Sequence, residues 1–294
     1  MKTGKIGGFQ PKLFSCLKDY SKETFVKDLL AGVIVGIVAL PLAIAFGIAS
    51  GATPEKGILT AIVAGFLISF FGGSKVQIGG PTGAFIVIVY GIIQDYGMNG
   101  LYVATFMAGA FLILMGLLHL GTIIKYIPYP IIVGFTSGIA LTIFTTQIKD
   151  LLGLQIESVP SGFIEKWGCY FQNMGTVNWR SLAIGVLSIL IIALTPKINR
   201  NLPGSLFAII IMTGICLLLQ NAGVADIETI GSRFSISASI PQASVPEINL
   251  TVVRELASPA LVIAMLGAIE SLLSAAVADG VIGDRHDSNQ ELVA

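Results

Sequence analysis

The stretch that decides the fold is KVQIGGPTGAF, residues 75–85. It interrupts hydrophobic sequence, because residues 57–71 before it and residues 84–93 after it are apolar enough to be buried in lipid. A helix that starts at Pro81 and ends at residue 93 has about 13 residues and is only ~20 Å long at ~1.5 Å per residue. A bilayer core is roughly 30 Å thick, so the sequence predicts a half-helix that starts near mid-membrane.

The start of such a half-helix is suited to binding an anion. The first N–H groups of a helix have no partner within the helix, and the helix dipole places positive charge there. We expect Thr82, Gly83 and Ala84 to present these N–H groups, with the Thr82 hydroxyl as a further donor. A short segment interrupted by glycine and proline indicates the binding site of a transporter. The alternative interpretation is a loop between two ordinary spans.

The composition indicates an all-α integral membrane protein. Hydrophobic residues make up 54% of the chain and charged residues only 12%, against about 25% charged residues in soluble domains. The 17 Lys and Arg residues balance the 17 Asp and Glu residues, which gives no support for a nucleic-acid partner. The three cysteines lie far apart without the spacing of metal ligands, so no metal site is predicted.

Hydropathy predicts eight membrane segments, at residues 29–48, 57–71, 81–93, 101–118, 127–148, 181–194, 204–219 and 256–278. Residues 1–28 are expected to form a cytoplasmic N-terminal segment, and residues 29–284 the membrane domain. Lys and Arg are more frequent in the segments expected on the same side of the membrane as the N-terminus than in those on the other side. Six of these lysines precede the first span. This bias predicts a multi-pass protein of the cell (inner) membrane with a cytoplasmic N-terminus and lipid on its outer surface.

Glu270 is the only carboxylate deep in a predicted span. A charge there costs at least ~2.5–3.5 kcal/mol on insertion scales, so we expect Glu270 to face a cavity and to bind a proton or a cation. Ser274 lies one turn further on the same helix face and is expected to share the cation. The alternative is a structural hydrogen bond to a neighbouring helix. No Ser-His-Asp or Cys-His pairing, HExxH motif or P-loop is evident, so the sequence predicts neither an enzyme nor ATP-driven transport by this chain alone.

Several motifs resemble the SulP/SLC26 anion transporter family, in the same order along the chain. They are ALPLAIAF at 39–46, GPTG at 80–83, IPYPIIVGF at 127–135, and the tail with RHDSNQEL at 285–292. The resemblance implies a UraA-like fold of seven plus seven inverted segments, of which this chain would hold the first repeat and one further helix. Residues 285–294 would then be a loop leading to a ninth helix that the chain lacks. We also expect a homodimer in the full-length protein, and members commonly carry a cytoplasmic STAS domain.

The resemblance also implies roles for individual residues. The implied anion-site residues are Thr82, Gly83 and Ala84, with Phe46 of the first span as a wall, and the implied coupling-ion pair is Glu270 and Ser274. Core-facing or lipid-facing packing is an equally common role for a phenylalanine such as Phe46. Glu270 stands where sodium-coupled members often have Asp, so both H⁺ and Na⁺ remain open as the coupling ion. No other cofactor is implied.

The leading hypothesis is secondary active transport of a small inorganic or organic oxyanion, with H⁺ or Na⁺ bound at Glu270. Sulfate is the default substrate, followed by bicarbonate and dicarboxylates. One alternative is a nucleobase permease of the same architecture, in which the Glu would hydrogen-bond the base. Another is an uncoupled anion channel, and a third is a fragment without activity of its own.

Overall fold

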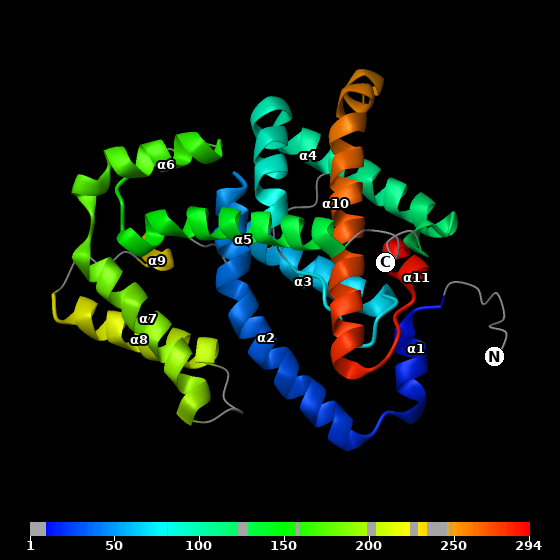
Figure 1. The fold of residues 1–294 in the computed structure, drawn as a ribbon, viewed down its shortest axis with the longest axis horizontal. Coiled ribbons are helices and arrows are strands. Elements are labelled where there is room, and N and C mark those ends of the chain that lie inside the picture. Colours follow the sequence, from blue (N-terminus) through cyan, green and yellow to red (C-terminus); the bar gives the residue numbers. More distant parts are fainter. Residues whose placement is uncertain are drawn as a thin grey trace. The chain divides into compact units, whose positions relative to one another are not determined.

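The computed structural model describes residues 10–80, 82–122, 129–156, 159–160, 162–198, 204–223, 229–233, 246 and 249–294, and no β-strand occurs in these ranges. Figure 1 shows the helices, which are α1 (Lys12–Cys16), η1 (Leu17–Asp19), α2 (Lys22–Ala49), α3 (Pro54–Phe71), η2 (Gly83–Phe85), α4 (Ile86–Leu117), α5 (Tyr129–Leu152), α6 (Phe163–Gln172), η4 (Met174–Thr176), α7 (Trp179–Ile198), α8 (Gly204–Asn221), α9 (Ile230–Arg233), α10 (Leu250–Ile282) and α11 (Ser288–Val293). The predicted all-α class is confirmed.

Local capping explains where the first two long helices begin. The side chain of Ser21 accepts a hydrogen bond from the Thr24 N–H at 3.1 Å, and that of Thr53 accepts one from the Lys56 N–H at 3.4 Å. Pro54 is the first residue of α3, where its missing N–H costs nothing. Serine and threonine at these positions satisfy N–H groups that the helix itself leaves unpaired.

Six elements of the described chain are long and apolar enough to cross a membrane: Lys22–Ala49, Pro54–Phe71, Gly83–Leu117, Trp179–Ile198, Gly204–Asn221 and Leu250–Ile282. Each coincides with a predicted segment, and Gly83–Leu117 contains two of them. The predicted segment 127–148 corresponds to α5, although residues 127 and 128 lie outside the described ranges. Large side chains such as Phe66 (65% exposed) and Phe106 (77% exposed) point outward. Such a surface is unfavourable in water and suits contact with lipid.

The helices form two compact units. Unit 1 contains Met1–Lys27, Leu42–Ser137 and Ser239–Ala294, and unit 2 contains Asp28–Pro41 and Gly138–Ala238. One boundary between the units falls inside α2 at Pro41, the proline within the first span. All the predicted site residues belong to unit 1.

Unit 1 is organised around the contact between α4 and α10. The buried residues of α10 recur every three or four positions and therefore lie on one face: Leu256, Ala260, Ala264, Ala268, Leu272 and Ala275. The facing part of α4 buries Val103, Ala104 and Ala108. Most of these side chains are small, which allows the two backbones to approach closely in the membrane.

The predicted half-helix is present and ends at Gly97. This residue has φ 67° and ψ −174°, a conformation that glycine adopts readily and that strains other residues. Figure 1 shows the two halves of α4 running in different directions. From Gly83 to Gly97 the helix has about 14 residues and is ~20 Å long at ~1.5 Å per residue, too short to cross a bilayer core. Pro81, the predicted first residue, lies outside the described ranges.

Residues 285–294 differ from the predicted loop, because they contain the short helix α11. Asp287 caps this helix, since its Oδ1 accepts hydrogen bonds from the Asn289 N–H at 3.0 Å and the Gln290 N–H at 3.1 Å. Four residues of the helix are buried: Ser288, Gln290, Glu291 and Leu292. Leu292 belongs to a small apolar cluster with Ala268 and Leu272 of α10. The segment is polar and buried because its side chains bond to neighbouring backbone groups, as described below.

Unit 2 contains the packed pair α7 and α8. Beside them in the same unit, α6 buries two polar side chains, Lys166 and Tyr170. Burial lowers the pKa of Lys166 and raises the pKa of Tyr170 to about 12. No predicted site residue lies in this unit.

Candidate anion and coupling-ion site

The segment of residues 75–85, here called the lead-in and half-helix start, lies along one face of α10. Four pairs of residues define the contact: Lys75 with Asp284, Gln77 with Ser271, Thr82 with Glu270, and Phe85 with Gly267. The numbers rise along one segment as they fall along the other, so the two run antiparallel. The stretch that predicted the fold therefore lies against the helix that carries the predicted coupling carboxylate.

Thr82 connects the start of the half-helix with Glu270. Its Oγ1 accepts a hydrogen bond from the Ala84 N–H at 3.4 Å, and its side chain lies close to the Glu270 carboxyl group. A hydroxyl carries one proton and two lone pairs, so it can accept from Ala84 and donate to Glu270 at the same time. The structure thus brings together one residue of the predicted anion site and one of the predicted coupling-ion site.

Gln77 fixes the lead-in to α10 next to Glu270. Its Nε2 donates to the carbonyl oxygen and to the Oγ of Ser271, each at 3.0 Å. Gln77 and Ser271 were not predicted as site residues. In the sequence, Gln77 lies near Thr82 and Ser271 lies next to Glu270. Nothing in the sequence indicates that Gln77 and Ser271 pair with each other.

An ion pair holds the start of the lead-in. The Nζ of Lys75 lies 2.7 Å from the Oδ2 of Asp284. The hydrogen bond and the opposite charge raise the pKa of Lys75 and lower the pKa of Asp284. Both side chains are partly exposed to solvent, so the pair orients the chain more than it stabilises the fold.

The other predicted site residues lie in unit 1 at varied depth. Gly83 is buried in η2 and Ala84 half-buried beside it. Phe46 is 6% exposed and lies in the part of α2 that approaches α3 at Gly57. Ser274 lies one turn beyond Glu270 and is exposed. The roles of Phe46 as a wall and Ser274 as a cation ligand stay predictions.

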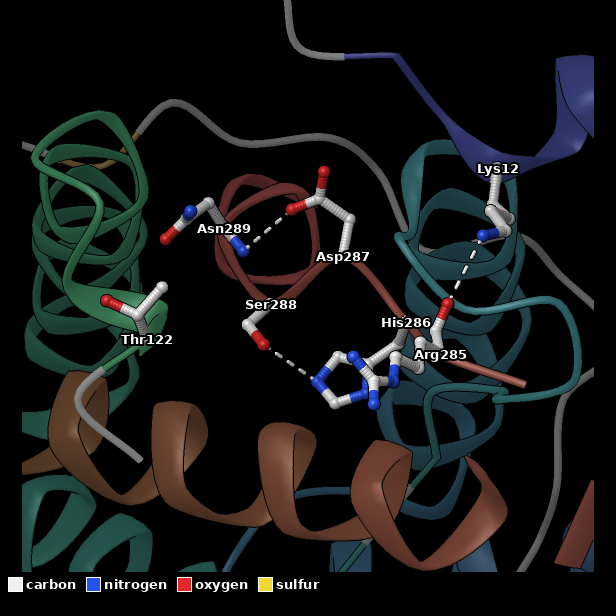
Figure 2. A pocket seen from close by; sticks show the side chains of 7 residues that line it. All are labelled: Lys12, Thr122, Arg285, His286, Asp287, Ser288 and Asn289. Atoms are coloured by element: carbon white, nitrogen blue, oxygen red, sulfur yellow. Dashed lines mark hydrogen bonds between the residues drawn. The ribbon is translucent and has the colours of Figure 1, made fainter. Parts of the chain in front are cut away.

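A separate pocket of about 270 Å³ lies beside α11, away from Thr82 and Glu270. Figure 2 shows its lining side chains, which are Lys12, Thr122, Arg285, His286, Asp287, Ser288 and Asn289. Most are polar, and none was predicted as a site residue. No group of three or more His, Cys, Asp or Glu side chains suited to a metal ion occurs within the described residues.

The structure contains an Asp-His-Ser contact that the sequence did not indicate. Beside this pocket, the Nδ1 of His286 lies 2.7 Å from the Oδ2 of Asp279, and its Nε2 lies 2.9 Å from the Oγ of Ser288. A serine nucleophile also needs N–H donors for an oxyanion. The nearest ones, of Asn289 and Gln290, already bond to Asp287. We therefore interpret the three residues as a structural contact between the end of α10 and α11.

A half-helix in a multi-helix membrane fold, with a half-buried carboxylate close to its N-terminal end, is typical of transporters built on broken helices. The family profile described as the sulfate permease family matches residues 25–294. The chain belongs to this family. The predicted family and the predicted UraA-like fold are confirmed.

Relatives and solved structures agree with this assignment. YvdB of Bacillus subtilis is 46% identical over 277 residues, which cover 94% of this chain and 52% of YvdB. The bicarbonate transporter BicA of a Picosynechococcus strain is 31% identical, over 90% of this chain and 48% of BicA. The solved transmembrane domain of a cyanobacterial BicA superposes with a TM-score of 0.77 at 32% identity, covering 93% of this chain and 71% of that one. The structure of SLC26A9 has a TM-score of 0.76 at 19% identity, over 96% of this chain and 48% of that one, and shows the fold alone.

The chain spans about half the length of the curated relatives it matches. A transporter site formed between two inverted repeats takes residues from both. The predicted site residues Thr82 and Glu270 would therefore supply one side of such a site.

Proposed function

We propose that this chain forms part of a secondary active transporter that moves a small oxyanion together with H⁺ or Na⁺. The observation that carries the proposal is that the Thr82 side chain lies close to the Glu270 carboxyl group, because this brings the expected anion donors next to the expected cation carboxylate. Sulfate is the first candidate substrate, with bicarbonate and dicarboxylates next. The name of YvdB refers to sulfate and that of BicA to bicarbonate, and this chain resembles about half of each.

The geometry suggests how the two ligands are coupled. In the structure the Thr82 hydroxyl accepts from the Ala84 N–H and lies close to the Glu270 carboxyl group. A charged Glu270 accepts a hydrogen bond from this hydroxyl and repels an incoming anion. Once Glu270 is protonated, or neutralised by Na⁺, the hydroxyl is free to donate to an anion together with the Gly83 N–H, and the Ala84 N–H joins them when it leaves the Thr82 Oγ1. Each ligand then offsets the charge of the other.

This coupling drives transport when only two forms of the carrier change conformation. The empty and the doubly loaded forms would alternate between the two membrane faces, while a form with one ligand would not. We propose Ser274 as the second oxygen ligand of the coupling ion and Phe46 as an apolar wall of the anion site. We further propose an inner-membrane protein with a cytoplasmic N-terminus, homodimeric at full length, that acts as a transporter and has no enzymatic activity.

Uptake by the reconstituted full-length protein tests this proposal. We expect labelled sulfate to accumulate in proteoliposomes above its equilibrium level only when a proton or sodium gradient is imposed. Unlabelled bicarbonate and oxalate serve as competitors in the same assay. Competition by uracil or xanthine, without competition by any oxyanion, would indicate a nucleobase permease. Sulfate currents that no cation gradient can drive would indicate a channel.

A further inference from the structure

Glu291 is a buried carboxylate outside the candidate site. It lies on α11 and is 5% exposed. Its Oε2 accepts a hydrogen bond from the Gly73 N–H at 2.8 Å, and its Oε1 accepts one from the Ser271 hydroxyl at 3.0 Å. The ion pairs of the described residues do not include Glu291. A carboxylate that is removed from water without a cation depends on such donors.

One donor lies on α10, which carries Glu270, and the other lies just before the lead-in. Gly73 precedes the lead-in by two residues, and Ser271 directly follows Glu270. Glu291 therefore links the lead-in to α10 through a third element. Gly73 has no room for a side chain, because a methyl group there would collide with the carbonyl oxygen of Asp287.

Glu291 also fixes the direction of the hydrogen bonds that reach Gln77. A carboxylate only accepts hydrogen bonds, so the Ser271 hydroxyl donates its one hydrogen bond to Glu291. The Oγ of Ser271 then accepts a hydrogen bond from the Nε2 of Gln77. The Gln77 amide is thereby oriented with its Nε2 toward α10. Its Oε1 is buried without a hydrogen-bond partner among the described residues, so this orientation depends on the acceptors on α10.

The helix that carries Glu291 is itself held in place. The Nε2 of Gln290 donates to the Phe71 carbonyl at 2.7 Å, at the end of α3. The Asp287 N–H donates to the Gly73 carbonyl at 2.9 Å, and the Gly121 N–H donates to the Oδ1 of Asn289 at 3.1 Å. Glu291 is thus fixed relative to the ends of α3 and α4.

We propose that Glu291 is a positioning residue for transport, which keeps the lead-in and α10 in the register that brings Thr82 to Glu270. This inference rests on the proposed function of the Thr82–Glu270 pair. Glu291 contacts neither that pair nor the proposed ligands, and acts through Ser271, Gln77 and Gly73. When the link is cut, the anion donors and the coupling carboxylate lose their fixed separation, so the affinities for both ligands fall together.

Two substitutions in the full-length protein test the role of Glu291. Glu291→Gln keeps the shape but turns an NH₂ group toward one of the two donors. We expect the KM for the anion and the half-saturating concentration of the coupling cation each to rise at least ~5-fold, with the maximal rate within ~2-fold of wild type. Gln77→Met cuts the same link without leaving a buried charge, and we expect a rise of ~3-fold in both constants. If Glu291→Gln does not fold, the two constants of Gln77→Met decide whether this link positions the site.

The control is Glu255→Gln, which removes an exposed carboxylate from the same α10. It should leave both constants within ~2-fold of wild type. Folded variants of Glu291 and Gln77 with wild-type constants for both ligands would overturn the positioning role. So would a lower maximal rate with both constants unchanged. Failure of the proposed function itself is distinguished by Glu270→Gln, which would then keep the full cation dependence of uptake.

Discussion

Replacing Glu270 with Gln in the full-length protein is expected to abolish cation-driven accumulation of the anion. The amide resembles the neutral, loaded carboxyl group in shape and charge, so anion binding remains. The variant has no group that gains or loses a proton or binds Na⁺ at this position, so a cation gradient has nothing to act on. We expect the accumulation ratio in proteoliposomes to fall at least ~10-fold, to the level reached without a gradient.

The measurement is the steady-state ratio of internal to external sulfate under an imposed proton or sodium gradient. Glu255→Gln on the same helix is the matched control and should accumulate sulfate as the wild type does. Anion exchange without a gradient should persist in Glu270→Gln, which shows that the variant is folded. If the variant retains gradient-driven accumulation, Glu270 is not the coupling residue.

Replacing Thr82 with Val is expected to weaken anion binding and to disturb coupling at once. Valine has nearly the shape of threonine but no hydroxyl, so the hydrogen bond from the Ala84 N–H and the interaction with Glu270 are both lost. A lost hydrogen bond to a charged group corresponds to about 1.5–3 kcal/mol, or a rise of ~10- to 100-fold in the anion dissociation constant. Titration calorimetry with sulfate measures this change.

Thr82→Ser is the matched control for this prediction, because it keeps the hydroxyl and should bind sulfate within ~3-fold of wild type. The double variant Thr82→Val with Glu270→Gln should bind no more weakly than Thr82→Val alone, because residues that act through one hydrogen bond are not additive. Equal affinities of Thr82→Val and wild type would show that the hydroxyl plays no part in anion binding.

The sequence was sufficient to predict the half-helix and to single out Glu270, because both signals are local. A Gly-Pro break in apolar sequence shortens a helix wherever the helix packs, and the break after it falls at a glycine, Gly97. Glu270 is conspicuous because its neighbours in the chain are apolar. Neither prediction requires knowledge of which helices touch.

The contacts between distant segments were not predictable in the same way. Gln77 pairs with Ser271, and Gly73 pairs with Glu291, across most of the chain length. A polar tail such as residues 285–294 normally indicates a solvated loop. Here Gly283, with φ 70°, ends α10, and the tail folds back so that its polar side chains bond to the ends of other helices. Periodicity carries no information about such pairings.

The most direct test of the account is the affinity for sulfate measured by calorimetry, with and without the coupling cation, in the full-length wild type and in Glu270→Gln. For a singly charged anion ~8 Å from the carboxylate at an effective dielectric of ~20, the repulsion is about 2 kcal/mol, and for doubly charged sulfate it is about twice that. We therefore expect acidification or Na⁺ to tighten sulfate binding at least ~10-fold in the wild type. Sulfate should tighten cation binding by the same factor, and Glu270→Gln should lose both effects. Sulfate affinity independent of pH and Na⁺ in the wild type, or the same dependence retained in Glu270→Gln, would contradict it.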